Sequence, residues 1–114
     1  MQPLDYSLCN QTVTLYRRVG TSVQRWEEAN CFYQWQQSQQ QGVSGVRRDT
    51  SFLLVLPGLR REILPGDRVF NGVGPLEVDW AAFVPAAVSG LSEVGYVQPF
   101  FWEGKLCHVE AGRK

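Results

Sequence analysis

Turn-forming residues interrupt this chain at short intervals and leave only short extended segments between them. The turn signals are Gly20, Pro57-Gly58, Pro65-Gly66-Asp67, Asn71-Gly72 and Glu103-Gly104. The segments between them are rich in β-branched and aromatic residues, a composition typical of strands. The chain is therefore predicted to be mostly β, in a small antiparallel β-barrel or sandwich.

Residues 12–18, TVTLYRR, show the strand pattern most clearly. Val13 and Leu15 fall on one face of an extended chain, and Thr14 and Tyr16 fall on the other. The turn at Gly20 then favours a hairpin into a second strand. Further strands are expected over residues 23–26, 31–35, 51–56, 68–70, 94–102 and 105–110.

Two sites allow more specific predictions: residues 51–56 and the Asn71-Gly72 turn. Residues 51–56 form a nearly continuous apolar run, which predicts a strand buried on both faces. Asn71-Gly72 is a hairpin signal, and a strand after it would place Glu77 and Asp79 on one face.

Proline and glycine set limits near the end of the chain. Residues 81–91 are the only helical candidate, and Pro85 and Gly90 limit it to one short turn. Pro99 favours an edge strand or a bulge within residues 94–102.

A chain of 114 residues fits one domain. We assign residues 1–11 to an N-terminal extension and residues 12–114 to a single β domain. Within it, the glutamine-rich segment Gln36 to Val46 lacks large apolar residues and is predicted to be an exposed polar loop. The alternative is a flexible arm that becomes ordered only against a neighbouring subunit.

No constellation of catalytic or metal-binding residues is recognisable. His108 is the single histidine, and its neighbour Cys107 would point to the opposite face of a strand. Cys9, Cys31 and Cys107 are far apart in the sequence and form no zinc-type spacing. We expect no catalytic, cofactor or metal site, and a protein that binds or assembles instead of an enzyme.

The N-terminus lacks the features of a signal peptide, and no apolar run is long enough to span a membrane. We therefore expect synthesis in a cytoplasm, reduced thiols and no membrane partner.

Eleven basic and eleven acidic residues give a formal net charge of +0, which argues against a nucleic-acid partner. Nine of the basic residues are arginine, and six of them form the pairs Arg17-Arg18, Arg47-Arg48 and Arg60-Arg61. With Trp26, Tyr33 and Trp35 as stacking platforms, these pairs leave one alternative open. That alternative is a small OB-like barrel that binds single-stranded nucleic acid.

Three segments together resemble a known family. They are TVTLYRR, ILPGDRVFNG over residues 63–72 and VGYVQPFFWEGKLCHVEAG over residues 94–112. Their order and spacing resemble small minor capsid or head–tail joining (head-completion) proteins of tailed phages and prophages of Gram-positive bacteria. The resemblance also takes in Trp35, the Leu56-Pro57 strand end and the His108-Val109-Glu110 strand end, from about residue 12 to residue 112.

The resemblance implies a virion structural or assembly protein, made in the host cytoplasm and located in the virion. Its partners would be copies of itself in a ring and neighbouring portal, capsid or tail proteins. It would use no cofactor. Arginine and tryptophan often dominate the binding energy of protein interfaces. The interface residues that we predict are Arg17, Arg18, Gln37, Gln40, Arg47, Arg48, Arg60, Arg61 and Trp102.

Overall fold

Seven strands, each paired antiparallel to its neighbours, make up the regular structure of a computed structural model that describes residues 6–42, 45–58 and 60–113. Over positions 36–42 and 45–51 it describes the backbone. The strands are β1 (Gln11–Val19), β2 (Ser22–Gly42), β3 (Gly45–Pro57), β4 (Arg68–Asn71), β5 (Leu91–Glu93), β6 (Tyr96–Trp102) and β7 (Lys105–Gly112). They form one sheet in the order β5-β4-β1-β2-β3-β7-β6.

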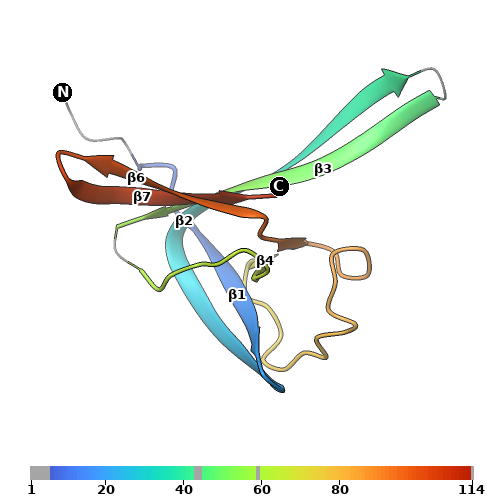
Figure 1. Cartoon of the computed structure of the whole chain (residues 1–114), viewed down its shortest axis with the longest axis horizontal. Coiled ribbons are helices and arrows are strands. Elements are labelled where there is room, and N and C mark those ends of the chain that lie inside the picture. Colours follow the sequence, from blue (N-terminus) through green and yellow to red (C-terminus); the bar gives the residue numbers. More distant parts are fainter. Residues whose placement is uncertain (1–5, 43–44, 59, 114) are drawn as a thin grey trace.

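The long strand β2 joins the two halves of this sheet. Its first half pairs with β1 as far as Cys31, and its second half pairs with β3 from Phe32 onward. The two ends of the sheet meet near Val94, whose N–H donates to the carbonyl of Asp67 at 2.8 Å. Gly95 N–H donates to Gly112 O at 2.7 Å. The sheet therefore curls into a half-barrel (Figure 1), which confirms the predicted mostly β, barrel-like fold.

Strand β1 is the most deeply buried element. Val13 and Leu15 pack into the main core between the two halves of the sheet. Tyr16 packs on the opposite face against Phe83. The two-faced burial that we predicted for residues 51–56 therefore belongs to β1.

Strand β3 instead alternates. Phe52, Leu54 and Leu56 are buried, whereas Leu53 and Val55 are half-buried. An apolar run alone does not specify a second covering layer, and β3 does not receive one.

The covering layer on β1 is the segment of residues 72–90. Thr14 donates its hydroxyl to Gly72 O, and Tyr16 donates its hydroxyl to Pro75 O, both at 2.7 Å. Gly74 packs so closely on Tyr16 that a Cβ there would lie 2.3 Å from the phenol oxygen. Two strand side chains thus hold an irregular segment against the sheet.

This segment corrects two predictions. Asn71-Gly72 does not close a hairpin, because β4 pairs with β1 and β5 while residues 76–80 form no strand. Glu77 and Asp79 therefore share no strand face. The short helical turn is reduced to isolated turns, such as the Val88 N–H to Val84 O hydrogen bond of 2.9 Å, and no helix occurs among the described residues.

Other local predictions are confirmed. Gly66 has φ of 95°, and the Asp67 N–H donates to Leu64 O across the Pro65-Gly66 turn. The pair Glu103-Gly104 closes the β6–β7 hairpin. Pro99 lies in the edge strand β6, next to a register shift between Phe100 and Phe101.

The polar loop predicted over Gln36 to Val46 is wrong. Strand β2 continues through Gly42 and β3 begins at Gly45, in unbroken register from Phe32↔Val55 to Gly42↔Gly45. Positions 43 and 44 lie outside the described residues. A lack of apolar residues argues against burial, but glutamine and serine can pair in an exposed ribbon whose backbone hydrogen bonds are made between its own strands.

We call residues Gln36–Gly42 of β2 and Gly45–Ser51 of β3 the arm. It extends away from the rest of the chain, toward the upper right in Figure 1.

Candidate assembly surface

Close to the arm, both β2 and β3 contribute side chains to the core. Tyr33 and Phe52 are buried, and their rings stack with centroids 5.8 Å apart. Trp35 pairs with Phe52 across the two strands, but its side chain is 54% exposed. The transition from core to arm therefore takes place over about two residues of β2.

Both long edges of the arm are open. Strand β1 pairs with β2 only as far as Cys31, and the Gln11 side chain extends that contact by accepting the Tyr33 N–H at 2.8 Å. Strand β7 pairs with β3 only as far as Leu53. Beyond these points no strand of the described residues pairs with either edge of the arm.

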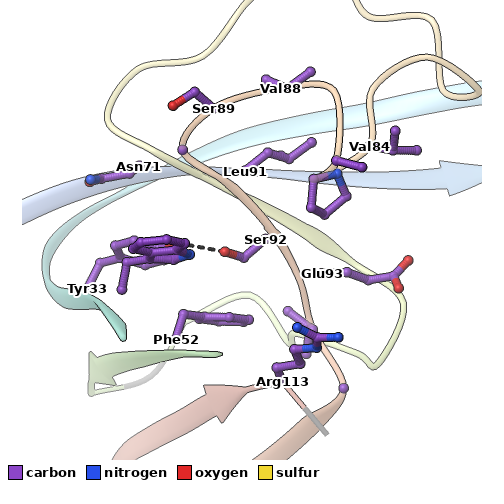
Figure 2. A pocket seen from close by; sticks show the side chains of 16 residues that line it. Tyr33, Phe52, Asn71, Val84, Val88, Ser89, Leu91, Ser92, Glu93 and Arg113 are labelled. Carbon is purple, nitrogen blue, oxygen red and sulfur yellow. Dashed lines mark hydrogen bonds between the residues drawn. The ribbon is translucent and has the colours of Figure 1, made fainter. Parts of the chain in front are cut away.

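A groove of about 920 Å³ lies at the base of the arm. Figure 2 shows Tyr33 and Phe52 on one side of it and the turn that carries Val84, Val88 and Ser89 on the other. The Tyr33 hydroxyl is hydrogen-bonded to Ser92 Oγ at 2.7 Å, which links β2 to β5. The groove is thus a continuation of the surface from which the arm projects.

Two of the predicted interface arginines hold the fold together. Arg17 donates to both carboxylate oxygens of Asp67, at 2.8 and 2.7 Å, and this pair ties β1 to the turn before β4. Hydrogen bonding to Asp67 raises the pKa of Arg17, although desolvation opposes it.

Arg60 is the second such residue. Its guanidinium donates to Pro57 O and Asn30 O and lies 3.3 Å from a carboxylate oxygen of Glu28. It bonds in this way to backbone at the far end of β3 and in the middle of β2. Arg17 and Arg60 therefore act within the chain.

Arg18 and Arg61, the second members of the sequence pairs Arg17-Arg18 and Arg60-Arg61, are more exposed. Arg18 donates to Gly20 O, and Arg61 is hydrogen-bonded to Gln24. The Arg61 guanidinium also lies 3.9 Å from the centroid of the Trp26 ring, and that of Arg17 lies 5.2 Å from it. Trp26 is thus already a cation–π partner of two arginines.

The remaining predicted polar residues lie in the arm. Gln40 pairs with Arg47 across its two strands, Arg48 pairs with Gln39, and Gln37 pairs with Thr50. The arm thus brings together four of the nine predicted interface residues, and their side chains lie outside the description.

Trp102 is half-buried at the end of β6, and stronger candidates lie beside it. Tyr96, Phe100 and Phe101 are 42%, 38% and 63% exposed. Three consecutive aromatic residues in a strand cannot all face a core, so the exposure of at least one of Phe100 to Trp102 was predictable from sequence.

The lone histidine sits in a network that the sequence did not reveal. His108 is buried in β7, and its Nδ1 is hydrogen-bonded to the Tyr6 hydroxyl at 2.7 Å. Its Nε2 is hydrogen-bonded to Glu110 Oε2 at 2.9 Å, and Phe100 stacks on the ring at 4.8 Å between centroids. These contacts tie the segment before β1 to the last strand.

The cysteines form no disulfide among themselves. Cys31 is fully buried, and burial raises the pKa of its thiol to about 11. Such a thiol stays protonated at neutral pH and behaves as a small apolar residue. Within the described residues no three histidine, cysteine or carboxylate side chains gather closely enough to hold a metal ion.

None of the described residues forms a helix long and apolar enough to cross a bilayer. Comparison with protein-family models, with curated proteins and with solved structures finds no match for this chain.

Proposed function

We propose that this chain is a structural subunit of a phage or prophage virion, a minor capsid or head–tail joining component that acts through protein–protein contacts. The observation that carries the proposal is the arm. No strand of the described residues pairs with either edge of this ribbon, and such a ribbon stabilises the monomer little, because isolated hairpins are only marginally stable in water. Such an element is better explained by contacts with another molecule.

The amount of exposed surface supports this reading. The chain exposes 7647 Å², whereas a folded monomer of its 12.9 kDa mass exposes about 6,300 Å². Its radius of gyration is 15.5 Å, against about 13 Å for a compact domain of this length. A subunit that completes its packing in an assembly has such excess surface.

Exposed apolar side chains also support the proposal. Leu76, Val73 and Phe101 are 80%, 66% and 63% exposed, and Trp35 is 54% exposed at the base of the arm. Aromatic residues are enriched in protein interfaces and often contribute most of the binding energy.

The nucleic-acid alternative stays a prediction, and nothing in the geometry favours it. Arg17 and Arg60 bond within the chain, and Trp26 already stacks with two guanidinium groups. A shift of labelled single-stranded DNA at low salt and micromolar protein would support the alternative, because phosphate contacts are strongest at low ionic strength.

Gene context is the first test. We expect the gene to lie between portal or major capsid genes and tail genes. A neighbourhood of metabolic genes alone would overturn the proposal.

The second test removes the arm without disturbing its base. Residues 37–50 are replaced by Asn-Gly, so that the paired residues Gln36 and Ser51 flank a two-residue turn. Because the buried residues Cys31, Tyr33, Phe52, Leu54 and Leu56 all remain, we expect a folded monomer with a β-type circular dichroism spectrum and a cooperative thermal melt. In a phage complementation assay this variant should fail to restore infectious particles.

A surface variant outside the arm serves as the matched control. Glu77→Gln changes an exposed side chain that has no place in the proposed interface, and we expect particle yield close to that of the wild type. Full complementation by the arm-deleted variant would contradict the role given to the arm.

A further inference from the structure

The described part of the chain presents several open strand edges. One is the second edge of β2 from Ser22 to Cys31, where β2 pairs with β1 alone and carries Arg25, Glu27 and Glu28. The others considered are the outer edges of β5 and β6 at the two ends of the sheet, and the two edges of the arm. Open edges expose unpaired N–H and C=O groups that can pair with another chain, and natural proteins usually protect them.

The two ends of the sheet are protected. Strand β5 is only three residues long. Strand β6 contains Pro99, which has no N–H to donate, and a register shift follows it between Phe100 and Phe101. Short length, proline and bulges all discourage strand addition.

The two edges of the arm differ from each other in charge. The open stretch of β3, residues Gly45 to Phe52, contains Arg47, Arg48 and Asp49. The open stretch of β2, residues Gln34 to Gly42, contains no charged residue and no proline, and its register with β3 is unbroken. It is the least protected of these edges.

We propose that the β2 edge of the arm pairs with the β3 edge of the arm of a second copy of this chain. This inference rests on the proposed assembly function and names the partner of the arm. The two open stretches have nearly the same length, nine residues against eight. An uncharged edge meets a charged one, so that two copies of Arg47-Arg48 are not opposed, as they would be if the β3 edges paired with each other.

The strand directions are compatible with a ring. When arms of identical copies lie side by side and point the same way, each β3 lies next to the β2 of the following copy and runs antiparallel to it. Such a contact is heterologous: it leaves one β2 edge and one β3 edge free at the ends of any open row. A row closes only as a ring, in which all arms form one continuous antiparallel barrel.

Mixed cross-linking tests this contact. One set of single variants, Gln37→Cys, Gln39→Cys and Gln41→Cys, marks the β2 edge, and a second set, Arg48→Cys and Thr50→Cys, marks the β3 edge. All five positions share one face of the arm. Proteins are mixed pairwise, treated with a short bis-maleimide, and the linked peptides are identified by mass spectrometry, with the wild type as the background from its native thiols.

We expect links between a β2-edge variant and a β3-edge variant, and none between two copies of the same β2-edge variant. Links among β2-edge variants alone would indicate a two-fold contact and overturn the inference. Sedimentation from about 10 µM to about 1 mM, the range of weak association, should show concentration-dependent self-association. A monomer at all concentrations without mixed links would also overturn it.

Charge substitutions add a sign-dependent test. Gln37→Lys with Gln41→Lys puts cations against the Arg47-Arg48 edge of the next copy and should weaken association about tenfold. Gln37→Glu with Gln41→Glu is the matched control and should weaken it less or strengthen it. Equal weakening by both would contradict the pairing with β3.

The two proposals can fail separately. If the arm-deleted variant cannot complete particles while the intact chain never self-associates, the assembly function stands and the partner of the arm is another protein. If the chain self-associates but the arm is dispensable for particles, the contact stands and the assembly function falls.

Discussion

The two halves of strand β2 share an extended backbone but differ in their partners and in their contribution to the core. From Ser22 to Cys31 it pairs with β1, from Phe32 to Trp35 it pairs with β3, and it contributes Cys31 and Tyr33 to the core. From Gln36 to Gly42 it continues to pair with β3, the only strand of the described residues that is paired with it there. The same strand thus serves first as the centre of a half-barrel and then as one side of a free ribbon.

This difference separates two properties that sequence patterns usually report together. Hydrophobic alternation reports burial, whereas strand formation needs only a partner for the backbone. At Cys31 and Tyr33 burial and strand pairing coincide. In the arm only the second is present, so substitutions there should affect assembly and leave stability nearly unchanged.

The largest loss of stability should come from the ion pair that closes the body. Asp67→Ala removes the acceptor of two Arg17 hydrogen bonds and of the Leu64 N–H, which donates to Asp67 at 2.9 Å. Because Asp67 is 2% exposed, we expect the free energy of unfolding to fall by about 3 kcal/mol. Urea denaturation followed by tryptophan fluorescence measures it.

Glu77→Ala is the matched carboxylate control. Glu77 is exposed, so its removal should change the free energy of unfolding by less than about 0.5 kcal/mol. Similar losses for the two variants would mean that the Arg17–Asp67 pair does not hold β1 to the turn before β4.

Local chemistry made much of the body predictable. The alternation in residues 12–18, the Pro65-Gly66 turn, the Glu103-Gly104 turn and the edge position of Pro99 each depend on a few adjacent residues. What could not be predicted depends on distant contacts. Nothing near Tyr16 shows that residues 72–90 will cover it, and nothing near Asn71-Gly72 shows that β4 will pair with β1 and β5.

The candidate surface was predictable in the same partial way. Composition marked residues 36–46 as unburied, but it could not distinguish a loop from a paired ribbon. Residue type alone predicts the arginine pairs as interface residues, whereas Arg17 and Arg60 are bonded within the chain. Tyr6 and Glu110, the partners of His108, carry no signal without the pairing of distant segments.

The pH dependence of stability at alkaline pH also distinguishes the body of the protein from the arm. Burial raises the pKa of Cys31 to about 11 from 9.0, and it also raises the pKa values of Tyr16 and Tyr33. The unfolded chain therefore loses these protons at lower pH than the folded chain. Stability is fully present below about pH 9 and is lost as pH rises toward 11, by up to about 2 kcal/mol for Cys31.

Urea titrations at pH 8, 9 and 10 measure this loss. The arm contains neither cysteine nor tyrosine, so the arm-deleted variant should lose stability with the same slope. Cys31→Ala should reduce the slope above pH 9. A slope that disappears with the arm would contradict the assignment of these groups to the body.

A smaller effect is expected at the boundary between the two regions. Tyr33→Phe removes the buried hydrogen bond to Ser92 Oγ and leaves that hydroxyl without its partner. We expect a loss of about 1.5 kcal/mol in the free energy of unfolding. Tyr96→Phe is the control on an exposed tyrosine, and a loss as large there would show that the Tyr33–Ser92 contact contributes little.

The smallest effects compare one residue type in the two regions. Gln11→Ala removes the side-chain oxygen that accepts the Tyr33 N–H at 2.8 Å, just where β1 stops covering β2. We expect it to cost about 1 kcal/mol, the value of a typical hydrogen bond. Gln39→Ala lies in the arm, where β3 is the one strand of the described residues that pairs with β2, and should cost less than about 0.5 kcal/mol. The same two variants should reverse their order in particle assembly, where Gln39→Ala reports on the arm and Gln11→Ala does not. If Gln39→Ala destabilised the monomer as much as Gln11→Ala, the arm would be part of the folded body and its open edges would need another explanation.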